Sequence, residues 1–237
     1  MIFTVSRLEI FCWNILLMIA DIYKVFADES ASISFACGPG CATCCTRSVT
    51  LTTGEGRLLV DFLRDTGRGL PELPRDLRPL RPALTTNGLA GSCLAGQEVP
   101  EEAESPWLFE PCFFLRENRC SVYEVRPFAC RSFVSTVNCG QAGMAEAPDW
   151  LVTLTIVTNQ LLEGLDRGGW WGNLADVLAF LDDGAGEEAR LTAQGRLLPN
   201  LPVPGLLVAL QEREMVDKYL ARLGKATGLD FAGLLFR

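Results

Sequence analysis

The sequence predicts a mainly helical α+β protein with an irregular cysteine-rich core and a C-terminal helical cap. Hydrophobic residues make up 49% and charged residues 21% of its 237 residues, which is enough apolar material for a sizeable core. Apolar residues recur at helical spacing in several segments, whereas the cysteines concentrate between residues 37 and 139. We therefore expect a cysteine-cluster domain with an N-terminal helix at residues 1–148, and a helical C-terminal region at 149–237 packed on it.

The first 27 residues are strongly apolar and predict a helix that is buried on most of its surface. Asp21 and Lys24 continue the periodic pattern beyond the apolar run at residues 15–20. A secretory leader or a membrane anchor is the alternative. The apolar run is shorter than the roughly 20 residues that span a bilayer, and Arg7 and Glu9 stand before it instead of a positive cluster.

The middle of the chain predicts one clear helix between irregular stretches. Thr52 and Glu55 stand in capping-box register before an apolar face, and Gly67 is a suitable stop, so we expect a helix over residues 52–66. Prolines and glycines interrupt residues 71–106, which predicts a surface excursion or lid. Short alternating apolar runs over residues 107–139 predict short strands or turns.

The C-terminal part predicts three helices that carry no cysteine. Apolar residues follow a period near 3.6 from Trp150 to Leu165, and Asn173 is placed to cap a second helix that ends near Leu181. A third helix is expected over residues 206–223, stopped by Gly224. Three prolines between residues 199 and 204 predict a rigid connection before it.

Composition excludes several classes of function. The chain has 21 basic and 29 acidic residues, a formal net charge of -8, so nucleic-acid or anionic-membrane binding is not expected. Histidine is absent, which removes Ser-His and Cys-His mechanisms. The remaining reactive side chain is cysteine, which occurs ten times. Unbridged thiolates fit a reducing, cytoplasmic location best.

Four cysteines crowd into the first cluster: Cys37, Cys41, Cys44 and Cys45. A tight turn can aim several thiolates at one metal ion while losing little chain entropy, and the glycines between the first two cysteines permit such a turn. Adjacent side chains diverge in a helix or a strand, so Cys44 and Cys45 are not expected to bind one mononuclear ion. Cys45 then either reaches a second metal or is a buried apolar side chain.

Three more cysteines form the second group: Cys112, Cys120 and Cys130. Their spacing alone is weak evidence, but together with the first cluster they complete a set of seven candidate metal ligands. Seven thiolates exceed the four that one tetrahedral zinc takes, which indicates a two-metal site or a polynuclear iron site.

Two arginines flank the last of these cysteines. Arg126 and Arg131 are placed to donate charge-assisted hydrogen bonds to sulfur. Tyr123 is expected to shape the loop around the ligands. The alternative is that the arginines lie in solvent or pair with nearby glutamates.

The cysteine pattern resembles a known family. The motif Cys-x-x-Cys-Cys at 41–45, the Pro-Cys-x-Phe-Leu around Cys112 and the run Cys-x-x-Tyr-x-x-Arg-Pro-x-x-Cys-Arg at 120–131 are similar to the CxxCxxCC family of zinc- or iron-chelating proteins, also called YkgJ-type cysteine cluster proteins. The resemblance covers roughly residues 35–135 and implies zinc, iron or iron-sulfur binding without an assigned reaction. Three residues separate Cys37 from Cys41 where the family has two, and Cys93 or Cys139 would supply an eighth sulfur.

Three hypotheses about function follow. The first is a cysteine-ligated zinc or iron binding protein whose partners are metal ions. The second is an iron-sulfur oxidoreductase or a radical-type modifying enzyme, since the spacing of Cys37, Cys41 and Cys44 resembles the one that radical S-adenosylmethionine enzymes use to leave one iron of a four-iron cluster open. The third treats the cysteines as buried thiols or disulfides of an exported protein. No general base can be identified, so no catalytic residue is assigned.

Overall fold

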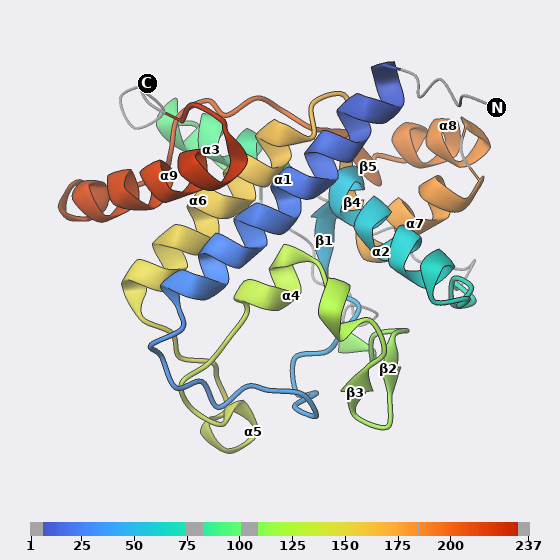
Figure 1. Ribbon diagram of the computed structural model, residues 1–237, viewed down its shortest axis with the longest axis horizontal. Coiled ribbons are helices and arrows are strands. Elements are labelled where there is room, and N and C mark those ends of the chain that lie inside the picture. Colours follow the sequence, from blue (N-terminus) through green and yellow to red (C-terminus); the bar gives the residue numbers. More distant parts are fainter. Residues whose placement is uncertain (1–6, 74–82, 101–108, 184, 232–237) are drawn as a thin grey trace.

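The computed structural model describes residues 7–73, 83–100, 109–183 and 185–231, and it is a mainly helical α+β fold (Figure 1). The helices are α1 (Arg7–Glu29), α2 (Thr53–Asp65), α3 (Thr86–Leu94), α4 (Phe128–Ser132), α5 (Cys139–Ala142), α6 (Asp149–Leu165), α7 (Leu174–Asp183), α8 (Ala185–Ala193) and α9 (Arg213–Thr227). Short 3-10 helices are η2 (Tyr123–Val125) and η3 (Leu210–Glu212). The strands are β1 (Thr50–Thr52), β2 (Leu115–Arg116), β3 (Arg119–Cys120), β4 (Trp170–Asn173) and β5 (Leu197–Pro199).

Helix α1 is a core helix, as its apolar sequence predicts. Ile19 and Ile22 are fully buried, and Phe26 is 4% exposed. The helix packs against α9, α2 and α6. None of the helices in the described ranges has the length and hydrophobicity needed to cross a membrane.

Helix α2 confirms the expected capping box. The Thr52 side chain accepts a hydrogen bond from the Glu55 backbone N–H, and the Glu55 carboxylate accepts one from the Thr52 N–H at 3.0 Å. Both donors would otherwise be orphaned at the first turn. The helix ends at Asp65, and Gly67 follows with a φ of +66°.

A three-stranded antiparallel sheet, absent from our sequence-based expectations, lies at the centre of the fold. Its strand order is β1-β4-β5, with Leu51 opposite Gly172 and Trp171 opposite Leu198. Gly172 is required because a Cβ there would lie 2.8 Å from the Arg196 carbonyl oxygen. Since β1 belongs to the N-terminal part and β4 to the C-terminal part, the sheet joins both sides of the expected boundary at residue 148.

The third C-terminal helix was wrongly placed by sequence. Residues 206–209 are not helical, because the Gln160 side chain binds the chain there: its Nε2 donates to the Gly205 carbonyl at 2.8 Å and its Oε1 accepts from the Leu207 N–H at 3.1 Å. Helix α9 instead begins at Arg213, runs through the expected stop and ends at Thr227, before the cap residue Gly228, which has a φ of +73°.

The expected proline-rich excursion contains a helix that sequence did not predict. Thr85 caps α3, and Asn87 and Ala90 are buried beneath it. Asn87 donates to the carbonyls of Gln160 and Leu201 at 3.0 and 2.9 Å, so tertiary contacts hold this segment on α6. Residues 74–82 and 101–108 of the excursion lie outside the described residues, so they do not test the expected lid.

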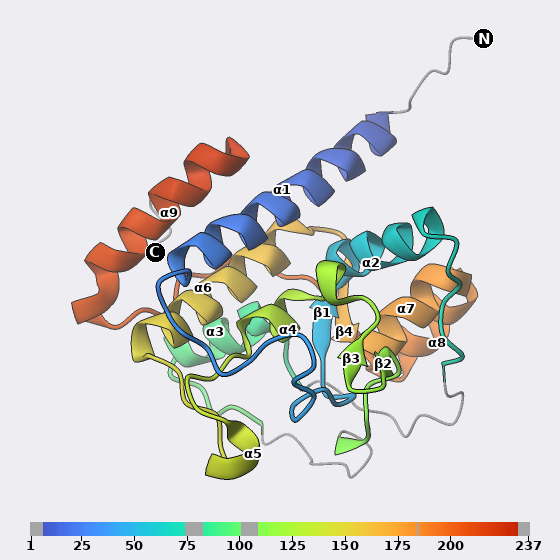
Figure 2. The ribbon, with the colours of Figure 1, turned by 60° about the horizontal axis from the view of Figure 1, so that its bottom comes forward.

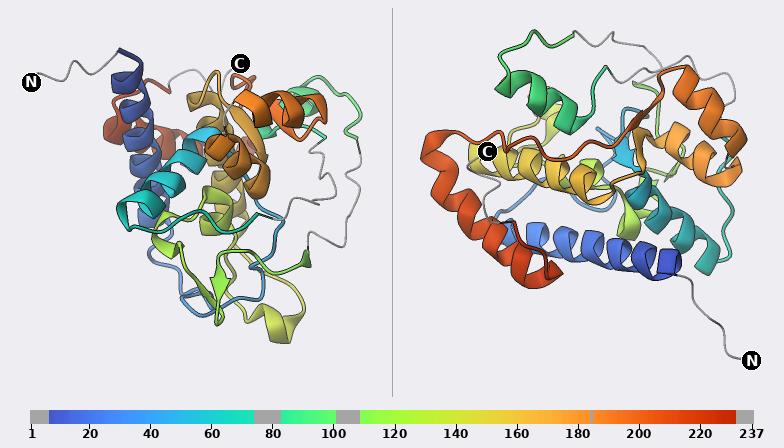
Figure 3. Two further views of the ribbon diagram at one scale, coloured as in Figure 1. Left: turned by 90° about the vertical axis from the view of Figure 1, so that its right-hand side faces the viewer. Right: turned by 90° about the horizontal axis from the view of Figure 1, so that it is seen from above.

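The helices form layers that leave the cysteine-bearing loops at one end. Seen from above, α6 lies between α3 and the pair α1 and α9 (Figure 3). A second hydrophobic cluster fills the space between β1, α2, α7 and α8. The loop before β1, the β2–β3 hairpin, α4 and α5 gather at the lower end of Figure 1, which Figure 2 turns towards the viewer.

Candidate functional site

All seven cysteines predicted from sequence line one pocket, together with an eighth. The pocket has a volume of about 970 Å³, and its sulfur-bearing lining residues are Cys37, Cys41, Cys44, Cys45, Cys112, Cys120, Cys130 and Cys139. The first four of these residues lie at positions 37–45 and the other four at positions 112–139, so only the tertiary fold brings the two sets together. The cysteines with described side chains are all free thiols.

The first cluster is built on successive tight turns. The Cys41 N–H donates to the Gly38 carbonyl at 2.9 Å, and the Cys45 N–H donates to the Ala42 carbonyl at 3.0 Å. Gly40 has a φ of +99°, a backbone conformation that residues other than glycine rarely adopt. The turns place Cys41 and Cys44 at the surface.

The second group is carried by the β2–β3 hairpin and α4. Cys120 stands opposite Leu115 in the hairpin, whose turn residues Glu117 and Asn118 have φ values of +48° and +59°. Cys130 lies in α4, which begins after Pro127. Proline suits this position because it lacks the N–H that a first-turn residue would leave unpaired.

Backbone contacts hold the two cysteine-bearing segments together. The Cys112 N–H donates to the Cys45 carbonyl at 2.9 Å, and Thr46 pairs with Pro111 in an isolated antiparallel bridge. Arg47 adds an ion pair with the Glu110 carboxylate at 2.5 Å. The loop after Cys45 and the loop before Cys112 therefore form one connected wall of the pocket.

Cys139 is the pocket cysteine that the ligand prediction did not include. It lies at the start of α5, where the Asn138 side chain caps the helix. Cys93, the other candidate for an eighth sulfur, is exposed on α3 and does not line the pocket. The sequence spacing gave no basis for choosing between Cys93 and Cys139 as the eighth sulfur. Cys139 lines the pocket because a backbone hydrogen bond holds the loop before it beside the first cluster: the Ala36 N–H donates to the Ser135 carbonyl at 2.8 Å.

Burial and mutual contacts set the acidity of the thiols. Burial raises the pKa of Cys130 to about 12 and also raises the pKa of Cys112. A hydrogen bond between Cys44 and Cys45 raises the pKa of Cys44 and lowers that of Cys45. Because metal binding requires thiolates, a bound cation would have to displace protons here.

The arginines contribute charge and brace the loop, without a hydrogen bond to sulfur among the described residues. Arg126 stacks over the Tyr123 ring, 3.7 Å from its centroid, and its Nε is buried with no partner in the part of the chain that is described. Arg131 donates from Nε to the Arg126 carbonyl at 2.8 Å and from Nη2 to the Glu124 carbonyl. The positive charge of Arg126 favours the thiolate forms of Cys44 and Cys130, and Arg131 interacts electrostatically with Cys130.

The donor set fits a thiophilic metal. Among the described residues no carboxylate lines the pocket, so this part of the chain does not offer the carboxylate ligands that calcium or magnesium prefer. Thiolates are the preferred ligands of structural zinc and of iron-sulfur clusters. Across the described ranges, no three metal-ligating side chains already stand close enough to hold an ion. Binding would therefore require the thiols to turn towards a common point.

Comparisons with known proteins do not add to this picture. No family model, no curated protein and no solved structure matches the chain significantly.

Proposed function

We propose that the protein binds zinc or iron through its cysteine pocket. The observation that carries the proposal is the convergence of eight cysteines on one pocket, whose described lining residues include no carboxylate. Incidental burial does not account for this, since Cys41 and Cys44 are exposed to solvent. The resemblance of residues 35–135 to the CxxCxxCC family of metal-chelating proteins supports the same function.

The chain's own residues have distinct roles in this proposal. The seven cysteines predicted from sequence, with Cys139, would hold the metal; bound metal would cross-link the loops and stabilise their fold. Arg126 would offset thiolate charge, and Tyr123 would hold its guanidinium in place through the stacking contact. Arg131 would hold α4 against the preceding loop through its hydrogen bonds to the Arg126 and Glu124 carbonyls. Metal ions are the proposed partners, and the free thiols support a reducing, cytoplasmic location.

The test is anaerobic purification followed by metal analysis, acid-labile sulfide analysis and a visible absorption spectrum on the same sample. Zinc without sulfide in a colourless sample would establish a zinc protein. Iron and sulfide in a brown sample would establish an iron-sulfur protein, and the proposal of an oxidoreductase or radical enzyme would then be tested by cluster-dependent cleavage of S-adenosylmethionine.

Two variants make the metal analysis specific. Cys120→Ser/Cys130→Ser removes two sulfurs of the pocket, whereas Cys93→Ser removes an exposed thiol outside it. We expect the double variant to bind less metal than the wild type and the Cys93 variant to keep the wild-type content. Failure of the wild type to retain either zinc or iron, including after anaerobic reconstitution, would refute the proposal.

A further inference from the structure

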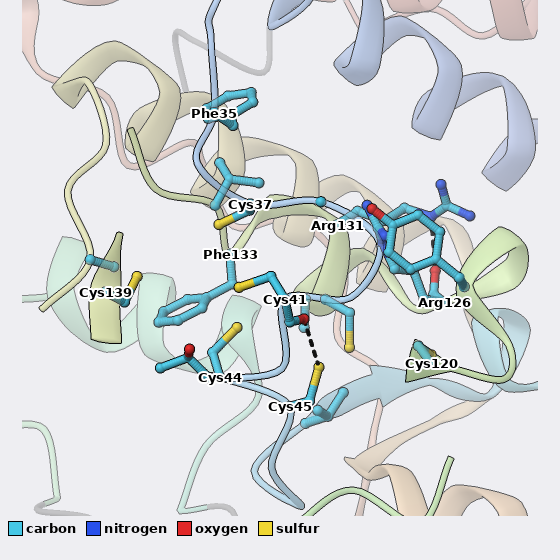
Figure 4. A pocket seen from close by; sticks show the side chains of 18 of the residues that line it. Phe35, Cys37, Cys41, Cys44, Cys45, Cys120, Arg126, Arg131, Phe133 and Cys139 are labelled. Atoms are coloured by element: carbon cyan, nitrogen blue, oxygen red, sulfur yellow. Dashed lines mark hydrogen bonds between the residues drawn. The ribbon is translucent and has the colours of Figure 1, made fainter. Parts of the chain in front are cut away.

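The eight sulfurs fall into two groups within the pocket. Figure 4 places Cys37, Cys41, Cys44 and Cys139 around Phe133, while Cys120 lies towards Arg126 on the other side. The electrostatic partners of Cys37 among the cysteines are Cys41, Cys44 and Cys139. Those of Cys45 are, besides Cys44, the three cysteines of the second group: Cys112, Cys120 and Cys130.

The outer group (Cys37, Cys41, Cys44 and Cys139) is built from two surface loops. The Ser135 N–H donates to the Cys37 sulfur at 3.2 Å, and the Cys139 sulfur lies 3.9 Å from the Val137 carbonyl oxygen. These contacts bring residues 37–44 and 135–140 together. Two of the four cysteines, at positions 41 and 44, are exposed.

The inner group (Cys45, Cys112, Cys120 and Cys130) rests on the hydrophobic core. Its last three members pack against the cluster formed by β1, α2 and α7, which none of the outer cysteines does. The Cys45 backbone carbonyl accepts a hydrogen bond from the Cys112 N–H, its sulfur lies 3.9 Å from the Cys41 carbonyl oxygen, and its electrostatic partners include all three of these cysteines. Arg47 and Arg116 act on Cys112, so this group also has more positive charge nearby.

Adjacent residues divide between the groups. The Cys44 side chain lies beside Cys41 and Phe133 in Figure 4, although it also interacts electrostatically with Cys130, whereas Cys45 has all three cysteines of the second group among its electrostatic partners. Four sulfurs on each side match the complete ligand set of one tetrahedral zinc or iron ion. This division also uses every cysteine that lines the pocket.

We propose that the pocket holds two separate four-cysteine metal centres, an inner centre at the core and an outer centre at the surface, and that the outer ion is the exchangeable one. The inference rests on the proposed metal-binding function. It adds the division of the cysteines into two centres, the assignment of Cys139 as the eighth ligand and the different exchange rates of the two ions. The outer ion would exchange faster because its ligands belong to loops and are open to a competing chelator, whereas the inner ligands are fixed by core packing.

The experiment uses the full chain reconstituted anaerobically with Zn²⁺ alone. Bound zinc is counted, and its release to a chromogenic chelator is followed in time. We expect about two ions per chain, in line with four thiolates per ion, and two phases of release. Cys139→Ser should retain about one ion and lose the fast phase, Cys120→Ser should lose the slow phase, and Cys93→Ser should match the wild type.

Cys44→Ser and Cys45→Ser test whether the centres share a ligand. Each should remove one phase, the fast phase for Cys44 and the slow phase for Cys45. Co²⁺ loading of the same variants reports tetrahedral sulfur coordination by absorption, which separates a lost ligand from a lost fold. Cys139 lies in a surface helix outside both hydrophobic clusters, so its variant tests the proposal even if an inner variant does not fold.

Each other outcome overturns the partition in a recognisable way. A single ion lost in both Cys139→Ser and Cys120→Ser would show one shared centre and leave the proposed function intact. The same conclusion would follow if Cys44→Ser or Cys45→Ser removed both ions, or if the metal were one iron-sulfide cluster dependent on both groups. Retention of both ions by Cys139→Ser would exclude an outer centre with this ligand. Binding of neither zinc nor iron would refute the proposed function itself.

Discussion

Replacement of Glu55 by alanine should be among the most destabilising single changes outside the cysteine pocket. The carboxylate joins three elements: its Oε1 accepts from the Tyr23 hydroxyl of α1 at 2.7 Å and from the Phe128 N–H of α4 at 2.9 Å, and its Oε2 accepts from the Thr52 N–H before α2 at 3.0 Å. All four residues are buried. Alanine would leave these three buried donors without an acceptor, and the Thr52 hydroxyl would also lose its contact with Oε2 at 3.2 Å.

The magnitude follows from those three donors. A buried donor that loses its partner costs about 1–3 kcal/mol. Burial also raises the pKa of Glu55, which means that keeping its charge in the core is itself unfavourable. Removal of the carboxylate relieves that unfavourable term and so reduces the net loss of stability. We therefore expect the free energy of unfolding to fall by about 3 kcal/mol, the sum of the lower value for each of the three donors. This is a large fraction of the roughly 5–15 kcal/mol that stabilise a typical domain. Glu55→Gln keeps an acceptor for Tyr23 and Phe128 but turns an amide N–H towards Thr52, and should cost roughly 1–2 kcal/mol.

Urea unfolding followed by far-ultraviolet circular dichroism measures these losses on samples of matched metal content. Glu214→Ala is the control, because Glu214 is exposed on α9 and pairs with Lys218 alone among the interactions recorded for it. It should leave the unfolding midpoint nearly unchanged. A Glu55→Ala loss below about 1 kcal/mol, or equal losses for alanine and glutamine, would refute the assignment of Glu55 as the acceptor for all three donors.

Further predictions concern buried charge and packing. Burial raises the pKa of Glu55 and Glu163, so the folded state binds more protons than the unfolded state and loses stability as pH rises from about 4 through the raised values. The stability advantage of the wild type over Glu55→Gln should therefore shrink over that pH range. A growing advantage would contradict this prediction. Phe128→Ala should cost about 3–5 kcal/mol in urea unfolding, because the ring is fully buried and packs edge-on against another ring at 4.8 Å. Arg196→Met should cost about 3–5 kcal/mol by stranding the buried Asp176 carboxylate, and adding Asp176→Leu should recover much of the loss; no recovery would argue against the pair.

Elements with local signals were predictable from sequence. Helix α2 followed from a capping box and an apolar face within fifteen residues, and α6 from its 3.6-residue period. The interactions that specify these two helices lie close together in the chain. The seven cysteines of the ligand prediction could also be selected from their spacing within each group, and all of them line the pocket, but the meeting of the two groups depends on the tertiary fold.

Elements that depend on distant partners were not predictable. Strand β1 is three residues long and pairs with β4 more than a hundred residues later, so its own sequence carries too little signal. Cys139 enters the pocket because Ser135 binds Ala36, and α9 starts late because Gln160 holds residues 205–207. Those hydrogen bonds exist only once the chain has folded.

The sequence by itself determined the helical class, the core helix α1 and the cysteine chemistry of the site, because composition, periodicity and spacing act over a few turns of chain. Tertiary structure alone decided that eight sulfurs share one pocket, that Cys139 belongs to it and Cys93 does not, and that a central sheet ties the two parts of the chain together. These features arise from contacts between segments far apart in the chain, where the free energy of burial and pairing outweighs local preference.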